Sequence, residues 1–141
     1  MQPMTMSRPF ARVIQVLRRA DLRPTRQRLA LATLLFEKGD RHVTAEALHE
    51  EALAASVEVS LATVYNTLHQ FVAAGLLREI VVDATRSYFD TNTSEHHHFY
   101  FEHSGRVEDI PADRVIVSNL PPPPDGTKVS RVDVVVRLDA K

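Results

Sequence analysis

Residues 60–90, SLATVYNTLHQFVAAGLLREIVVDATRSYFD, change their hydrophobic period at Gly75. Before this glycine, apolar residues recur every three or four positions, as at Leu61, Val64 and Leu68, which is typical of a helix with one buried face. After it, two stretches alternate with a period of two on either side of a short polar turn, which predicts a β-hairpin. A helix followed directly by such a hairpin predicts a winged helix.

Three further helices are predicted upstream. The first has an apolar stripe formed by Phe10, Val13, Ile14 and Leu17. The second and third begin after Thr25 and Thr44, and the helix described above begins after Ser60. Each of these hydroxyl residues can accept a hydrogen bond from a free amide at the helix start. Together with the hairpin, these helices predict a winged helix-turn-helix domain over residues 1–92.

A second, smaller domain is expected over residues 93–141. Its predicted elements are strands at 96–103 and 106–110, a short helix at 112–120, a plain proline-rich loop at 121–124 and a strand at 129–138. Because so few elements give a thin core, we expect a second copy of the chain to complete the sheet. The predicted fold class is therefore α+β, with a winged helix-turn-helix domain followed by a small α/β dimerisation domain, and the predicted assembly is a homodimer.

The composition is that of a globular protein without cysteine chemistry or a membrane span. The 141 residues are 44% hydrophobic and 25% charged, as in an ordinary globular protein. Cysteine is absent, which excludes disulfides, cysteine-ligated zinc and thiol catalysis. No apolar run approaches the length of a membrane span, so we expect a cytoplasmic protein without a membrane partner.

The charges are unevenly distributed, although the formal net charge is only −1. Residues 1–30 contain seven arginines and one acid, Asp21, which gives a local charge of +6. Acidic residues gather instead around the histidines in the second half of the chain. This asymmetry suits a protein whose N-terminal part binds a polyanion and whose C-terminal part binds a cation. Chance clustering of charges on two solvated faces explains it equally well.

The predicted helix that begins after Ser60 has a polar face opposite its apolar stripe. Its members are Ala62, Thr63, Tyr65, Asn66 and His69. A DNA major groove admits one helix, whose hydroxyl, amide and phenol groups can contact base edges and thymine methyls. Arginines at positions 23, 26 and 28 would neutralise phosphates or enter a minor groove. These features predict double-stranded operator DNA as a partner, and the alternative is a face that is simply solvated.

The stretch SEHHHFYFEHSG, residues 94–105, predicts a metal site. In a strand, His96 and His98 share one face, so that two imidazoles can hold one ion, while His97 points to the other face. Candidates for the remaining ligands are His42, Asp90 and Asp109. Because His42 belongs to the first domain, a shared ion would clamp the two domains at a fixed angle. The alternative is a structural polar strand.

Four quoted stretches resemble the ferric uptake regulator family, in the right order and over most of the chain. They are LRPTRQRLALATLL, HVTAEALHEEA, VSLATVYNTLHQFVAAGLL and HHHFYFEHSGRVEDI. The resemblance implies a dimeric winged-helix transcription factor whose C-terminal domain binds metal, with Tyr65 at a thymine and Arg23 at the minor groove. The expected DNA-binding residues are Arg23, Thr25, Arg28, Ser60, Thr63, Tyr65 and Asn66.

The resemblance also implies a regulatory site for a divalent metal (Fe, Mn or Zn) formed by His42, Asp90, His96, His98 and Asp109. A second family site is incomplete, because Arg131 stands where its C-terminal histidine would be, beside Glu95 and His97. Within the family, the histidine run and the absence of cysteine pairs are most similar to the iron response regulator branch, which is associated with haem. That similarity implies His96, His97 and His98 as haem ligands.

The resulting hypothesis is an iron-responsive DNA-binding regulator, mainly a repressor of iron and haem metabolism genes, whose histidine site controls DNA binding through metal or haem. One alternative is a divalent-metal sensor without haem. Another is a metal-dependent hydrolase, although the sequence offers no HExxH pattern or equivalent. A third is a structural DNA-binding module that works without metal.

Overall fold

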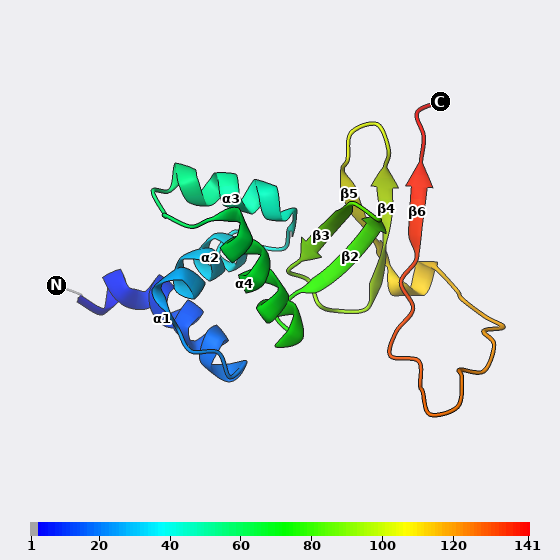
Figure 1. The fold of residues 1–141 in the computed structure, drawn as a ribbon, viewed down its shortest axis with the longest axis horizontal. Coiled ribbons are helices and arrows are strands. Elements are labelled where there is room, and N and C mark those ends of the chain that lie inside the picture. The colour runs from blue at the N-terminus through cyan, green and yellow to red at the C-terminus, as the bar shows by residue number, and fades with distance from the viewer. Residues whose placement is uncertain (1–2) are drawn as a thin grey trace. The chain divides into compact units, whose positions relative to one another are not determined.

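The computed structural model describes residues 3–141, with side chains from residue 11 onward, so the Phe10 side chain of the predicted apolar stripe lies outside the described part. The elements are α1 (Pro3–Arg19), α2 (Arg26–Phe36), β1 (His42–Val43), α3 (Ala45–Ala54), α4 (Leu61–Ala73), β2 (Arg78–Asp83), β3 (Arg86–Asp90), β4 (His96–Phe101), β5 (Val107–Pro111), the 3-10 helix η1 (Ala112–Arg114) and β6 (Val135–Leu138) (Figure 1). The chain forms two compact units that divide between Thr93 and Ser94. Among the described residues, no helix has the length and apolar character needed to cross a membrane.

The three predicted N-caps are confirmed. The side chains of Thr25, Thr44 and Ser60 accept hydrogen bonds from the backbone N–H three residues later, at 3.3, 3.1 and 3.1 Å. Each cap satisfies one of the amides that a helix leaves free at its start, which stabilises the helix by about 1 kcal/mol. The sequence therefore fixes where α2, α3 and α4 begin.

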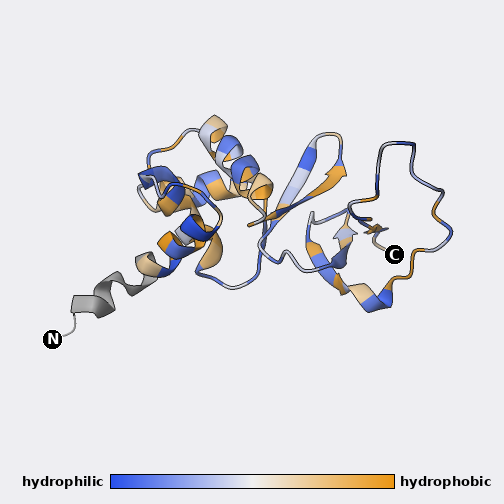
Figure 2. Cartoon of the chain, turned by 90° about the horizontal axis from the view of Figure 1, so that it is seen from below, coloured by the Kyte–Doolittle hydropathy of each residue, from blue (hydrophilic) through white to orange (hydrophobic). Residues whose placement is uncertain are grey.

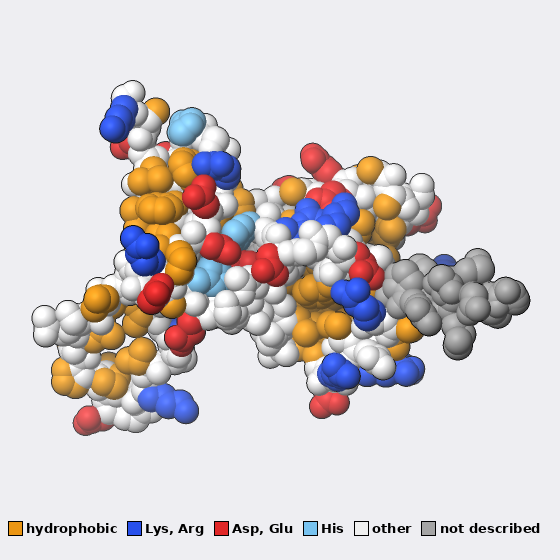
Figure 3. All heavy atoms as spheres, turned by 180° about the vertical axis from the view of Figure 1, so that it is seen from behind, with side chains coloured by type: hydrophobic (Ala, Val, Ile, Leu, Met, Phe, Trp, Pro, Cys, Tyr) orange, Lys and Arg blue, Asp and Glu red, His pale blue; other side chains and the backbone are white. Residues whose placement is uncertain are grey.

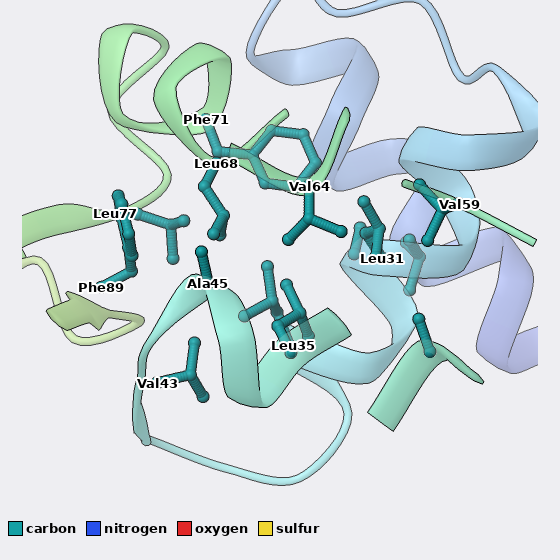
Figure 4. Close-up of a cluster of buried hydrophobic side chains, with 14 of the residues drawn as sticks. Leu31, Leu35, Val43, Ala45, Val59, Val64, Leu68, Phe71, Leu77 and Phe89 are labelled. Atoms are coloured by element: carbon teal, nitrogen blue, oxygen red, sulfur yellow. The ribbon is translucent and has the colours of Figure 1, made fainter. Parts of the chain in front are cut away.

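The core of the N-terminal unit lies between the four helices and the sheet, and α1 contributes Val13 and Leu17. Leu31 and Leu35 from α2 point toward Val64, Leu68 and Phe71 from α4 (Figure 4). Hydropathy colouring shows orange and blue residues on the same helices, as expected where one face is buried (Figure 2). The apolar stripe predicted for residues 60–75 is therefore the face by which α4 packs.

The sheet of this unit has the order β1-β3-β2 and is antiparallel. Strands β2 and β3 form the predicted hairpin, and the Asp83 carboxylate accepts hydrogen bonds from the N–H and hydroxyl of Thr85 in its turn, at 2.9 and 2.8 Å. Strand β1 is not predicted from the sequence. It pairs His42 with Asp90 and Val43 with Phe89, so it brings residue 42 to the end of the hairpin.

The C-terminal unit is a sheet of order β5-β4-β6, with β4 antiparallel to β5 and parallel to β6. Side chains of the central strand β4 alternate between buried and half-buried, and His96, His98 and Tyr100 form the buried set. The predicted separation of His97 from its two neighbouring histidines is confirmed.

Two predictions in this unit are wrong. Residues 112–120 were expected to be helical, but only Ala112–Arg114 form a 3-10 turn, because the β-branched run 115–117 favours extended backbone and Pro121 follows soon after. The strand expected over 129–138 is limited to Val135–Leu138, the part that pairs with β4. Every residue from Ile116 to Arg131 is exposed, and hydrophobic side chains are visible on the surface of this unit in Figure 3.

Candidate metal centre and nucleic-acid interface

In the N-terminal unit, His42 and Asp90 face each other across β1 and β3. The His42 Nε2 lies 3.1 Å from Asp90 Oδ2, and the Asp90 side chain is 1% exposed. Asp90 Oδ1 accepts a 2.9 Å hydrogen bond from the N–H of Asn92, which leaves Oδ2 turned toward the imidazole. The neighbouring residues are also tied together, since Arg41 and Thr91 exchange two hydrogen bonds, at 2.9 and 3.1 Å. The strand pairing of His42 with Asp90 and these flanking hydrogen bonds hold the two residues opposite each other.

In the C-terminal unit, His96 and His98 both point to one carboxylate oxygen. Their Nε2 atoms lie 3.3 and 3.5 Å from Asp109 Oδ1, and their ring centroids are 4.5 Å apart. Strand β5 supplies Asp109 directly opposite His98, with an exposed fraction of 38%. The imidazoles themselves are buried. This arrangement places two nitrogens and one oxygen around a common point.

The tautomer of His96 is fixed by its surroundings. Its Nδ1 lies 2.6 Å from the carbonyl oxygen of Ser94, and because a carbonyl only accepts, Nδ1 must carry the proton. In the neutral ring, Nε2 then presents a lone pair to Asp109 Oδ1, which is also an acceptor. A cation between the two atoms removes this repulsion, and an Nδ1–H bound to a carbonyl is the usual support of a metal-binding histidine.

His97 has the opposite tautomer. Its Nδ1 accepts a 3.0 Å hydrogen bond from the N–H of Val134, so the neutral ring carries its proton on Nε2 and has no lone pair left for an ion. Close to Val134 in sequence, Arg131 Nε donates a 2.8 Å hydrogen bond to Asp133 Oδ2, so the Arg131 guanidinium has a carboxylate partner within the protein. His97 and Arg131 therefore each have a partner within the C-terminal unit.

On the fourth helix, the predicted DNA-contacting side chains are partly engaged by the protein. Ser60 Oγ accepts from the Thr63 N–H and donates to Thr63 Oγ1 at 2.9 Å, so both hydroxyls lie at the helix start. The Tyr65 hydroxyl donates to Glu46 Oε2 on α3 at 2.8 Å, and this bond raises the Tyr65 pKa. Asn66 is exposed. Glu46 is not among the sequence-predicted contacts, since its position reveals nothing without the packing of α3 against α4.

The arginines before and within α2 are also organised. Arg28 donates from Nε and Nη2 to Gln70 Oε1 on α4, at 3.2 and 3.0 Å, and from Nη1 to the Arg23 carbonyl at 3.0 Å. Thr25 caps α2, and the Arg23 side chain is exposed. These hydrogen bonds hold the guanidinium of Arg28 beside α4.

Two other histidines, His49 and His69, lie outside the predicted ligand set. His49 Nε2 lies 2.9 Å from the carbonyl oxygen of Val59, which ties α3 to the residues before α4. His69 is 54% exposed, and its Nε2 lies 3.8 Å from Glu79 Oε2. Each of the two has a partner that accounts for its position without an ion.

Comparison with known sequences identifies relatives over most of the chain. Residues 19–131 match the profile of the ferric uptake regulator family. The ferric uptake regulation protein of Legionella pneumophila is 36% identical over 97 residues, which are 68% of this chain and 71% of that protein. A peroxide-responsive repressor PerR of Staphylococcus aureus is 33% identical over 97 residues, which are 69% of this chain and 65% of the repressor.

Solved structures share the fold. The ferric uptake regulator of Vibrio cholerae has a TM-score of 0.70 at 22% identity and covers 90% of this chain and 98% of its own. The ferric uptake regulator of Pseudomonas aeruginosa with manganese has a TM-score of 0.67 at 25% identity, with 90% and 96% covered. The predicted α+β fold class is thereby confirmed. The chain belongs to the ferric uptake regulator family, whose members are transcription regulators and not enzymes.

Proposed function

We propose that this protein is a metal-responsive, DNA-binding transcription regulator that acts mainly as a repressor of iron metabolism genes. A homodimer in the cytoplasm would bind double-stranded operator DNA through α4 of each subunit, with residues 1–92 as the DNA-binding domain and 93–141 as the dimerisation domain. Five side chains would hold one divalent cation: His42, Asp90, His96, His98 and Asp109. Family membership supports both parts of this proposal.

The observation that carries the metal assignment is the orientation of His96. Its protonated Nδ1 is held by the Ser94 carbonyl, so that its Nε2 lone pair is directed at a carboxylate oxygen. A second imidazole, from His98, is directed at the same oxygen. Protonating both rings would place two positive charges side by side, whereas a single cation satisfies both nitrogens and the carboxylate together.

The chemistry of the donor set restricts the choice of ion. Three imidazole nitrogens and two carboxylate oxygens suit Fe, Mn or Zn, whereas Ca²⁺ and Mg²⁺ prefer oxygen ligands alone. Among solved relatives, one ferric uptake regulator was obtained with manganese, another with iron, and a manganese uptake regulator with zinc. We therefore expect Fe, Mn or Zn here, with iron as the regulatory ion.

The consequence for DNA binding follows from where the ligands lie in the chain. The DNA-binding domain provides His42 and Asp90, and the dimerisation domain provides the other three ligands. A bound ion would neutralise the two carboxylates and fix both sets of ligands in one arrangement. Ion occupancy would thereby set the spacing of the two α4 helices in the homodimer, and with it the affinity for the operator.

Haem, the second ligand implied by the histidine run, does not fit these residues. His96 and His98 are only 5% and 2% exposed, whereas an axial ligand must lie open to a porphyrin many times the size of an imidazole. His97 is on the other face, and its Nδ1 is occupied by the Val134 amide. We therefore propose a divalent ion without haem as the signal.

Metal binding to tag-free protein tests this proposal. Equilibrium dialysis against Mn²⁺, Zn²⁺ or Fe²⁺ should give one strongly held ion per subunit. His42→Ala and His96→Ala should each abolish strong binding, while His97→Ala, the matched control, should retain it. Strong binding that survives His42→Ala would refute a shared site. A haem titration of the same proteins, read as an absorption spectrum, should show no change that depends on His96 or His98.

A further inference from the structure

Glu46 is an exposed acid at the edge of the surface proposed to bind DNA. Its Oε2 accepts the 2.8 Å hydrogen bond from the Tyr65 hydroxyl, which joins the start of α3 to the second turn of α4. A carboxylate at this place is unexpected, because DNA phosphates repel it. The Tyr65 hydroxyl satisfies one acceptor position of this carboxylate, and a hydrogen-bond donor on the DNA would offset the repulsion from the phosphates.

Both members of this pair are held in place by their helices. Glu46 lies in the first turn of α3, behind the N-cap of Thr44, where the helix dipole favours a negative charge. Tyr65 follows the Ser60 cap of α4, and its ring lies 6.2 Å from that of His69. The raised pKa of Tyr65 keeps its hydroxyl a donor to Glu46. The carboxylate is thus oriented before any DNA arrives.

An ionised carboxylate offers about four acceptor positions, of which the phenol uses one. In the major groove, cytosine presents only its N4 amine as a polar group, while adenine presents an acceptor beside its amine, and guanine and thymine present acceptors. The base edge that suits a carboxylate without repulsion is therefore that of cytosine.

Given the proposed entry of α4 into the major groove, we propose that Glu46 is a base-reading residue that accepts a hydrogen bond from a cytosine N4 amine. The cytosine belongs to a base pair next to the one that Tyr65 contacts. Tyr65 has two tasks in this arrangement, since its ring faces one base pair and its hydroxyl positions the carboxylate for the next. Glu46 is then a determinant of operator sequence and not only of affinity.

Full-length, Mn²⁺-loaded protein can be used to select operators from a random duplex library and to measure the affinity of every single-base variant. Wild type should prefer C over each other base at one position by about tenfold. Glu46→Ala should lose that preference and leave the other positions unchanged. Glu46→Gln should shift the preference to adenine, because a glutamine amide pairs with adenine N6 and N7.

Glu50→Gln is the matched control, because it removes the same charge from an exposed residue one turn later on α3. It should keep the wild-type sequence preference. If Glu46→Ala and Glu46→Gln change affinity equally for all sequences, or not at all, Glu46 does not read a base and the inference is overturned while DNA binding stands. If wild type selects no sequence, the proposed function fails and this inference fails with it.

Discussion

Replacing His98 with alanine removes one imidazole from the face of β4 that is turned toward Asp109. The His98 side chain is almost fully buried, and its Nε2 lies 3.5 Å from Asp109 Oδ1. Its backbone pairs with Asp109 on one side and with Val135 on the other, so the strand should stay in place without the ring. The substitution therefore reports mainly on the loss of a ligand.

The size of the effect can be worked out from linkage. Removing even an outer-shell partner of a metal ligand lowers metal affinity about 10–100-fold, and losing a direct ligand should reach the upper end. At an ion concentration of about 100 times the wild-type Kd, binding stabilises the wild type by about 2.7 kcal/mol. A variant with 100-fold weaker affinity gains only about 0.4 kcal/mol under the same conditions. The difference, about 2.3 kcal/mol, corresponds to a Tm difference of about 5–10 °C for a chain of this size.

Differential scanning calorimetry with and without Mn²⁺ measures this difference. We expect the Mn²⁺-induced rise in Tm to be large for wild type and nearly absent for His98→Ala. His97→Ala should keep the wild-type rise, because its ring bonds to the Val134 amide and faces away from Asp109. Equal rises in wild type and His98→Ala, or an equal loss in His97→Ala, would refute the ligand assignment.

Three further predictions concern stability. The side-chain hydrogen bonds from Arg41 lower the Glu51 pKa, so this pair stabilises the fold above the ordinary carboxyl pKa, and the contribution is lost as pH falls through the lowered value. Glu51→Gln should cost about 1–3 kcal/mol of unfolding free energy at pH 7 in urea titrations, and the cost should shrink below about pH 4; a pH-independent cost contradicts this. Leu68→Ala, which truncates a fully buried side chain, should cost about 2–5 kcal/mol in the same assay, and a cost below about 1 kcal/mol would contradict its place in the core. Ser60→Ala should cost about 1 kcal/mol and Ser60→Asp much less, because aspartate also caps; equal losses would show that the cap is not the cause.

Much of the N-terminal unit could be predicted because its signals are local. Hydroxyl caps, the apolar spacing of α4 and the change of period at Gly75 all depend on residues close in sequence, and the structure agrees with each. The face shared by His96 and His98 could be predicted for the same reason, since it needs only the alternation of a strand.

The remaining features depend on contacts between distant residues. Strand β1 has two residues, too few for a periodic pattern, and it exists because β3 offers its free edge to residues 42 and 43. Residues 112–120 contain helix-compatible side chains, but their β-branched run and the neighbouring prolines favour extended backbone. The Glu46–Tyr65 hydrogen bond joins residues 19 apart and requires the packing of α3 on α4. The tautomers of His96 and His97 likewise depend on which backbone group each ring meets.

The most direct test of metal control is the operator affinity of the full-length protein as a function of free Mn²⁺ or Fe²⁺, measured by fluorescence anisotropy. For wild type, we expect the operator Kd in chelator and in saturating metal to differ by about 5–150-fold, the usual range for coupled sites. For His42→Ala, the two values should coincide. A wild-type Kd that is the same with chelator and with metal would contradict the proposed regulation.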